Sequence, residues 1–177
     1  RLSHEEAMQA IYIKGRDNAR TPVQWDASAN GGFSPEGVTP WIAVNPNYPS
    51  INAEAVLADE DSIFYHYQQL VALRRGKLKD LMAYASFAPV DSVQVPHNED
   101  EAVYAYTRTG GADGSPANES LLVVSNFTAE EQERDFAVLN EAREAGARVE
   151  LVSSNYKDDA GSTLRPYEAK VYLFGNA

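Results

Sequence analysis

Two arginines and two aspartates lie close together near the start of the chain, in the segment RDNARTPVQWD that runs from Arg16 to Asp26. A guanidinium group is planar and always charged, and it can donate to a carboxylate and to neutral oxygen atoms at the same time. Arg16, Asp17 and Arg20 are therefore candidate residues for binding a polar ligand. The same side chains could instead form ion pairs that only anchor the segment, and their spacing leaves both roles open.

The other residue types offer little for metal or thiol chemistry. The chain has no cysteine, which excludes disulfides, thiolate metal sites and cysteine nucleophiles. Its three histidines, His4, His66 and His97, follow no metal-ligand spacing. We therefore expect no metal site and no cofactor. A chain without cysteine also suits a reducing compartment, so we expect a cytoplasmic location.

The charge balance narrows the choice of partners. The chain has 26 acidic and 15 basic residues, a formal net charge of -11. Such a surface repels nucleic-acid phosphates and anionic lipid headgroups, and no segment approaches the roughly 20 apolar residues of a membrane span. We expect no nucleic-acid partner and no membrane partner, and a neutral ligand such as a sugar fits the charge.

Helical patterns flank a long irregular segment. Residues 4–14 and 62–75 have helical spacing, with Gly15 and Gly76 as stop signals. Residues 16–61 contain five prolines and a Gly-Gly pair, which predicts an irregular loop. Four aromatic residues of this loop could stack on sugar rings or, more commonly, pack the loop against the protein: Trp25, Phe33, Trp41 and Tyr48.

The pattern changes to strands after residue 81. Short alternating or apolar runs separated by glycine-rich turns predict an antiparallel, all-β sandwich. The expected strands are residues 102–108, 121–126, 134–139, 148–153 and 170–174. The sequence therefore predicts two domains, residues 1–80 and residues 81–177.

The segment from Arg16 to Asp26 resembles the RDNARTPMQWD signature of oligo-1,6-glucosidases and related α-glucosidases of the α-amylase superfamily. Val23 departs from the usual methionine, but the exchange is between apolar residues. Further resemblances to the family follow in order and span nearly the whole chain: Gly32-Phe33, PWI at 40–42, VNPNY at 44–48, Ile51-Asn52, SIFY at 62–65, Tyr67, Leu73-Arg74, NFT at 126–128 and LRPYEA at 164–169.

The resemblance implies a fold. The family has a (β/α)8 catalytic barrel followed by a C-terminal β-sandwich. By that resemblance the chain is an α+β fragment. Residues 1–80 would be the end of the barrel, with the loop after the eighth strand and the last helix, and residues 81–177 would be the antiparallel sandwich. The rest of the catalytic barrel would be the missing partner of this fragment.

The resemblance also implies a reaction. The family hydrolyses α-glucosidic bonds with retention, which needs two carboxyl groups about 5–5.5 Å apart. The family places both on earlier barrel strands, and none of those motifs occurs here, so we expect no catalytic residue in this chain and no activity from it alone. Its whole protein would be an exo-acting α-glucosidase for α-1,6 or α-1,4 bonds of short oligosaccharides.

Arg20 would take the binding role in that enzyme. In the family an arginine of this signature pairs with an aspartate from an early barrel loop, and together they bind the hydroxyls of the terminal glucose. That role corresponds to Arg20, with Arg16 as the second candidate, while a structural role is at least as plausible for Arg16 and Asp17. Two alternatives remain: a stand-alone carbohydrate-binding β-sandwich, or part of a related isomaltulose or trehalulose synthase or trehalose-6-phosphate hydrolase.

Overall fold

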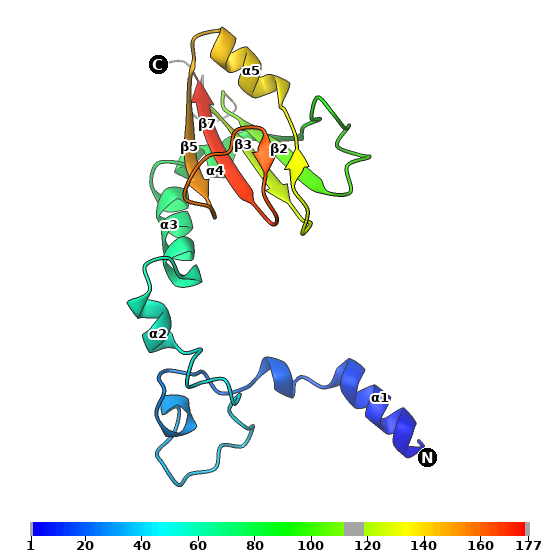
Figure 1. The fold of residues 1–177 in the computed structure, drawn as a ribbon, viewed down its shortest axis with the longest axis vertical. Helices are drawn as coiled ribbons and strands as arrows, with labels where there is room; N and C mark the ends of the chain where they lie inside the picture. The colour runs from blue at the N-terminus through cyan, green and yellow to red at the C-terminus, as the bar shows by residue number, and fades with distance from the viewer. Residues whose placement is uncertain (1, 112–118, 176–177) are drawn as a thin grey trace. The chain divides into compact units, whose positions relative to one another are not determined.

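The structure is a computed structural model that describes residues 2–111 and 119–175 (Figure 1). The chain divides into two compact units, Arg1–Tyr67 and Gln68–Ala177. The division falls inside the helix α3, Ile63–Arg75, and the domain boundary near residue 80 stays a prediction from the sequence. Helices and loops make up the first unit, and an antiparallel sheet dominates the second.

The first helix, α1, spans His4–Lys14, as the sequence predicts. Ser3 begins it with a capping box, in which the Glu6 backbone N–H donates to Ser3 Oγ at 3.2 Å and the Ser3 N–H donates to Glu6 Oε2 at 2.7 Å. The helix ends at Gly15. No described residue of α1 is buried, and Tyr12 is 80% exposed.

The segment predicted to be irregular contains helical turns. The short helix α2 spans Ala53–Ala58 and is capped by Asn52, whose side chain accepts from the Ala55 N–H at 2.8 Å. Two 3₁₀ turns, η1 at Asp17–Ala19 and η2 at Ala29–Gly32, precede it. The prediction of an entirely irregular loop is wrong here because a good N-cap can start a single helical turn within a proline-rich segment.

Helix α3 confirms the helix expected over residues 62–75 to within one residue. It is followed by α4, Lys79–Tyr84, a helix that the sequence pattern does not reveal because six residues are too few to show a period. Leu81 of α4 is only 1% exposed.

Five strands form one antiparallel sheet in the order β1-β2-β3-β7-β5. Four of them confirm expected strands to within two residues at each end, and β1 is an addition at the edge. The strands are β1 Ser86–Pro89, β2 Val103–Thr109, β3 Glu119–Asn126, β5 Arg148–Ser154 and β7 Ala169–Gly175. A separate two-stranded ribbon pairs β4, Gln132–Glu133, with β6, Thr163–Leu164.

The expected strand over residues 134–139 is wrong. Its second half begins helix α5, Ala137–Glu144 (Figure 1). Phe136 and Leu139, three residues apart, are both buried, and the residues after Leu139 are mostly helix formers. Because of α5, the second half of the chain is not all-β.

On each face of the five-stranded sheet a set of apolar side chains is buried. On one face, buried residues of the sheet pack with α5 and β6: Val103, Ala105, Leu122, Val124, Tyr172, Phe136, Leu139 and Leu164. On the other face, Leu121 packs against Leu78, Leu81 and Ala85 from α4 and its flanks. The sheet therefore has a buried apolar core on each side.

Candidate signature-loop site

Of the three predicted site residues, Asp17 begins the turn η1, and Arg16 and Arg20 flank it. The turn is closed by backbone bonds from Ala19 N–H to the Arg16 carbonyl and from Arg20 N–H to the Asp17 carbonyl, both 3.0 Å. The side chains of Arg16, Asp17 and Arg20 are exposed, and none of them bonds to another described side chain. The turn therefore presents two guanidinium groups and one carboxylate that are not engaged with each other.

The residues after this turn are tied to a segment almost thirty positions later. We call residues 16–54 the signature loop. Gln24 Nε2 donates to Asn47 Oδ1 at 3.0 Å and to the Ile51 carbonyl. The Ala53 and Glu54 N–H groups donate to the carbonyls of Gln24 and Trp25, both at 2.9 Å. These bonds close residues 24–54 of the signature loop on themselves.

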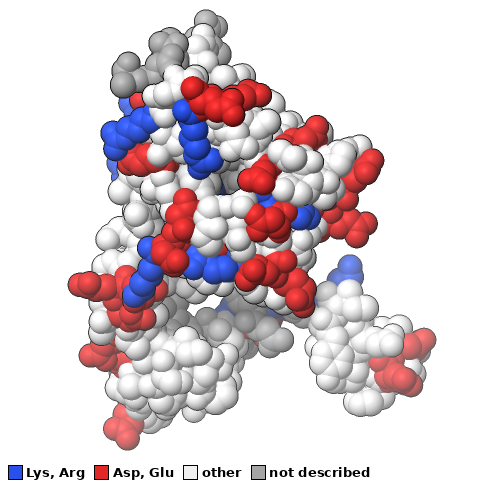
Figure 2. Space-filling view, turned by 45° about the horizontal axis from the view of Figure 1, so that its top comes forward, with Lys and Arg blue, Asp and Glu red and all other residues white. Residues whose placement is uncertain are grey.

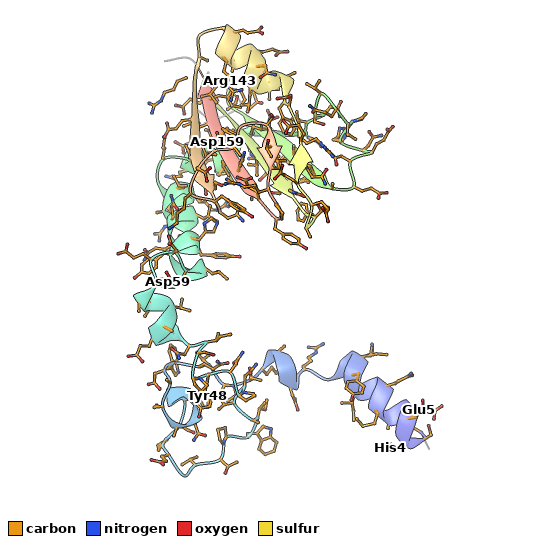
Figure 3. The ribbon with its side chains drawn as sticks, in the orientation of Figure 1. His4, Glu5, Tyr48, Asp59, Arg143 and Asp159 are labelled. Atoms are coloured by element: carbon orange, nitrogen blue, oxygen red, sulfur yellow. The ribbon has the colours of Figure 1, made fainter. Side chains whose placement is uncertain are left out.

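The buried Gly31 also contributes a backbone hydrogen bond to the signature loop. Its carbonyl accepts from the Trp25 N–H at 2.7 Å, and its φ of 62° lies in the left-handed region that favours glycine. Gly31 is buried, and Tyr48, labelled in Figure 3, lies beside it. The Gly31 backbone thus forms part of the interior of the signature loop.

The far turn of the signature loop is organised by two polar side chains. Asn30, itself at a φ of 56°, donates through Nδ2 to Ser34 Oγ and to the carbonyls of Pro35 and Val38, at 2.8 to 3.1 Å. The Asp26 carboxylate accepts from the side chain and the backbone N–H of Ser28, and these hydrogen bonds lower the pKa of Asp26 below its usual value.

The four aromatic residues of the signature loop differ in exposure. Trp41 is fully exposed, Trp25 and Phe33 are 55% and 50% exposed, and Tyr48 is partly buried. The polar side chains that hold the loop are those that sequence reasoning missed: Gln24, Asn30, Asn47 and Asn52. The signal was present, because asparagine favours turns, caps and left-handed backbone.

A second polar cluster joins two other motifs, NFT and LRPYEA. Asn126, 3% exposed, donates through Nδ2 to the carbonyls of Glu130, Leu164 and Arg165 at 2.8, 3.3 and 2.9 Å. Arg165 in turn forms a bidentate ion pair with the buried Glu168 carboxylate, in which Nη2 donates to Oε1 at 2.8 Å and Nε donates to Oε2 at 3.2 Å. The guanidinium carbon of Arg165 also lies 4.0 Å from the centroid of the Tyr156 ring. The two motifs therefore form one structural unit.

The carboxylate of Glu168 remains ionised in this cluster. Burial by itself would raise the pKa of Glu168, but the hydrogen bonds from Arg165 outweigh it and lower that pKa below its usual value. The cluster is thus a paired, hydrogen-bonded set of charges, and it offers no free acid or base for catalysis.

Neither a metal-binding group nor a membrane span is found in the part of the chain that the structure describes. Residues 2–111 and 119–175 contain no cluster of three histidine or acidic side chains placed to hold a metal, and their helices include none that could cross a membrane. On the face shown in Figure 2, acidic side chains are scattered and interspersed with basic ones. The visible surface therefore carries no continuous basic patch.

Comparisons with known proteins identify the family. Residues 2–84 match the family model for the α-amylase catalytic domain. Over 174 residues the chain is 41% identical to an oligo-1,6-glucosidase of Bacillus cereus, an alignment that covers 95% of this chain and 27% of that protein.

Solved structures agree with the sequence match. The trehalose-6-phosphate hydrolase of Bacillus licheniformis superposes with a TM-score of 0.75 at 36% identity, covering 97% of this chain and 28% of that one. The isomaltulose synthase of Klebsiella sp. LX3 gives a TM-score of 0.72 at 30% identity, covering 98% and 28%. The chain spans less than a third of the length of the relatives it matches. It belongs to the α-amylase family of glycoside hydrolases and corresponds to one part of these longer enzymes.

Proposed function

We propose that this chain is part of a retaining, exo-acting α-glucosidase that hydrolyses α-1,6 bonds of short glucosyl oligosaccharides, with α-1,4 bonds as a second substrate class. The identity of 41% to an oligo-1,6-glucosidase supports this choice among the family's reactions. In this proposal the chain supplies a substrate-binding loop, and the catalytic carboxylates come from the remainder of the protein.

The proposed binding role rests on the exposure of the Arg20 guanidinium and on its lack of a partner among the described side chains. Arg20 directly follows the turn η1, which two backbone hydrogen bonds close, and its guanidinium is exposed and unpaired among the described side chains. An exposed, planar donor at the end of a hydrogen-bonded turn suits two-sided recognition of a carboxylate and sugar hydroxyls. Arg20 would bridge a carboxylate of the remaining barrel and the terminal glucose, with Arg16 and Asp17 beside it.

The apolar side of α3 supports a missing partner. Ile63 is 76% exposed, Tyr67 64% and Val71 49%, at positions separated by four residues along the helix. Such a stripe is the face that a helix normally buries, and most helical stability comes from that burial. We infer that the stripe packs against the rest of the catalytic barrel.

The decisive experiment is a substrate panel with the whole protein that contains this chain. Isomaltose, maltose, sucrose and trehalose 6-phosphate are compared by kcat/KM, and the anomer of the released glucose is followed by NMR. The proposal expects isomaltose to be the best substrate, with α-glucose released first.

Other outcomes replace the proposal. Rearrangement of sucrose to an isomeric disaccharide without glucose release identifies a synthase, and a preference for trehalose 6-phosphate identifies a phosphodisaccharide hydrolase. Release of β-glucose first contradicts retention. The 177-residue chain assayed alone serves as the negative control, because the proposal expects it to show no turnover.

A further inference from the structure

Three aromatic side chains form a continuous row across strands β1 and β2. The ring centroids of Phe87 and Tyr106 are 5.2 Å apart, and those of Tyr104 and Tyr106 are 5.9 Å apart. Tyr104 and Tyr106 share a face of β2 because they are two residues apart, and Phe87 is diagonal to Tyr106 in the strand register. We call these three residues the aromatic row.

The aromatic row is accessible to solvent within its unit. Phe87 is 51% exposed, Tyr104 is 44% exposed and Tyr106 is partly exposed. The hydroxyls of Tyr104 and Tyr106 bond to no described residue. By contrast, the hydroxyls of Tyr156 and Tyr172 each donate to a protein acceptor, at 2.9 and 2.8 Å. The row therefore combines open ring surfaces with two hydroxyl groups that no described residue engages.

One charged side chain, Arg108, lies beside the row. Arg108 shares this face of β2, but its guanidinium donates to the carbonyls of Leu81 and Met82, at 3.4 and 3.0 Å, at the end of α4. The residues opposite Tyr104 and Tyr106 on β3 are Ser125 and Val123. Two nitrogens of the Arg108 guanidinium are thus engaged by main-chain carbonyls, and Ser125 and Val123 carry no charge.

We propose that the aromatic row binds the apolar ring faces of glucosyl units in a short α-glucan chain. Tyrosine offers a rigid apolar face and a polar tip, and a sugar ring offers an apolar C–H face bordered by hydroxyls, so both halves of the interaction are matched. The choice of glucosyl units rests on the proposed function, whereas the stacking geometry does not.

Two other occupants fit less well. Nucleic-acid bases also stack on aromatic rows, but a net charge of -11 repels their phosphates. A protein strand added to the edge strand β1 would meet Pro89, which has no N–H to donate. A neutral, ring-shaped ligand remains the occupant that the row and its surroundings favour.

The test titrates the 177-residue chain with maltotetraose and, separately, isomaltotetraose by isothermal calorimetry. We expect saturable binding of at least one of them with Kd of roughly millimolar order, as suits a shallow surface. Tyr106→Ala removes the central ring and should weaken binding about tenfold or more. Tyr104→Phe keeps the ring and removes one hydroxyl, so it should weaken binding about three- to tenfold.

The matched control is Phe127→Ala. Phe127 is an exposed aromatic of the same unit, 67% exposed, and its ring contacts no other described aromatic ring. Its removal should leave Kd unchanged. If Tyr106→Ala fails to fold by circular dichroism, Tyr104→Phe, which deletes a single atom, decides the question.

Three results would overturn the proposal: no saturable binding by the wild-type chain, equal binding by wild type and the row variant that folds, or protection of Tyr104 and Tyr106 from hydroxyl-radical labelling in the whole protein without sugar. The last result would mean that another part of the protein covers the row. Turnover of p-nitrophenyl α-glucoside by the whole protein is measured alongside. Its absence would contradict the proposed glucosidase function and leave a measured oligosaccharide affinity of the row intact.

Discussion

The ammonium group of Lys170, 1% exposed, lies 3.0 Å from Oδ1 of Asp159 and donates to it. The same nitrogen donates to the carbonyls of Gly161 and Thr163 at 2.9 and 3.0 Å, so all three of its protons have acceptors. The Tyr172 hydroxyl also donates to Oδ1 of Asp159, which is labelled in Figure 3, at 2.8 Å. The buried ammonium group of Lys170 thus links strand β7 to the loop before β6 by hydrogen bonds.

Replacing Lys170 by methionine tests this role. Lys170→Met keeps the volume of the side chain but leaves Asp159 and two carbonyls short of a donor. Removing one partner of a buried pair costs about 3–5 kcal/mol, and we expect the lower end because the Asp159 side chain is 35% exposed. The measurement is the free energy of unfolding in urea.

Lys77→Met is the matched control for that change. Lys77 also pairs with a carboxylate, Glu150, at 2.8 Å, but its side chain is 46% exposed. Exposed ion pairs contribute about 0–1 kcal/mol, so this variant should be close to wild type. Equal losses in the two variants would show that burial of Lys170 has no energetic consequence.

The stability of the second unit should fall in acid. Burial alone would raise the pKa of Asp159, but hydrogen bonds from Tyr172 and Lys170 lower it, and the pKa of Glu168 is lowered by Arg165 against the same opposing effect of burial. Because both pKa values are depressed in the folded state, these carboxylates stabilise the fold above their ordinary pKa values of 3.8 and 4.5. That contribution is lost as the pH falls through the folded-state values.

Urea unfolding of the chain at pH 7, 5, 4 and 3 measures this loss. Glu168→Gln removes one of the two titrations, so its unfolding free energy should be lower at pH 7 and should depend less on pH between 5 and 3 than that of wild type. An identical pH dependence in the two proteins would exclude Glu168 as a contributor.

Gly32 is required for the geometry around Asp26. Its φ is +67°, and a Cβ atom would lie 2.6 Å from Oδ2 of Asp26. Gly32→Ala should therefore disturb the Asp26–Ser28 turn and reduce hydrogen-exchange protection of the Trp25 and Ser28 amides.

Gly37→Ala is the control, since Gly37 has a φ of +83° but no atom within 4 Å of the added Cβ. Both variants carry the left-handed backbone cost of about 1–2 kcal/mol, and only Gly32→Ala adds the steric clash. Equal protection of both amides in the two variants would remove the steric explanation.

The sequence predicts those elements whose signal is local. Helix α1 has its cap at Ser3 and its stop at Gly15, and strands β2 and β3 have alternating or fully apolar runs, so all three lie within two residues of their expected bounds. At the start of helix α5 the sequence predicts a strand instead, because the apolar residues Phe136 and Leu139 fit the pattern of either element.

The polar architecture is harder to predict because its partners are distant in sequence. The side chain of Gln24 is hydrogen-bonded to Asn47, 23 residues later in the sequence, and that of Asn126 is hydrogen-bonded to Leu164, 38 residues later. Nothing in the local pattern distinguishes the buried Lys170 from a lysine on the exposed side of a strand. The sequence therefore identifies η1 and its exposed residues as a candidate site, while the hydrogen bonds that hold the signature loop emerge only from the structure.

Arg20 provides the sharpest test of the proposed substrate binding, made in the whole protein. Arg20→Lys keeps the charge but loses the planar fork, so it cannot hold a carboxylate and a sugar hydroxyl in fixed geometry. Losing hydrogen bonds to a charged group costs about 1.5–3 kcal/mol, which corresponds to a roughly 10- to 150-fold loss of kcat/KM on isomaltose. Arg20→Ala should cost more, because it leaves the partner carboxylate unpaired.

Thermal melts separate this binding role from a structural one. Arg20 is exposed on η1 and bonds to no described side chain, so Arg20→Lys should leave the melting temperature close to that of wild type. A lowered melting temperature with near-normal kinetics would indicate that Arg20 only anchors the signature loop. Arg16→Lys, four residues earlier on the same turn, is the matched comparison. If Arg16→Lys lost activity while Arg20→Lys stayed within about threefold of wild type, the substrate-binding arginine would be Arg16.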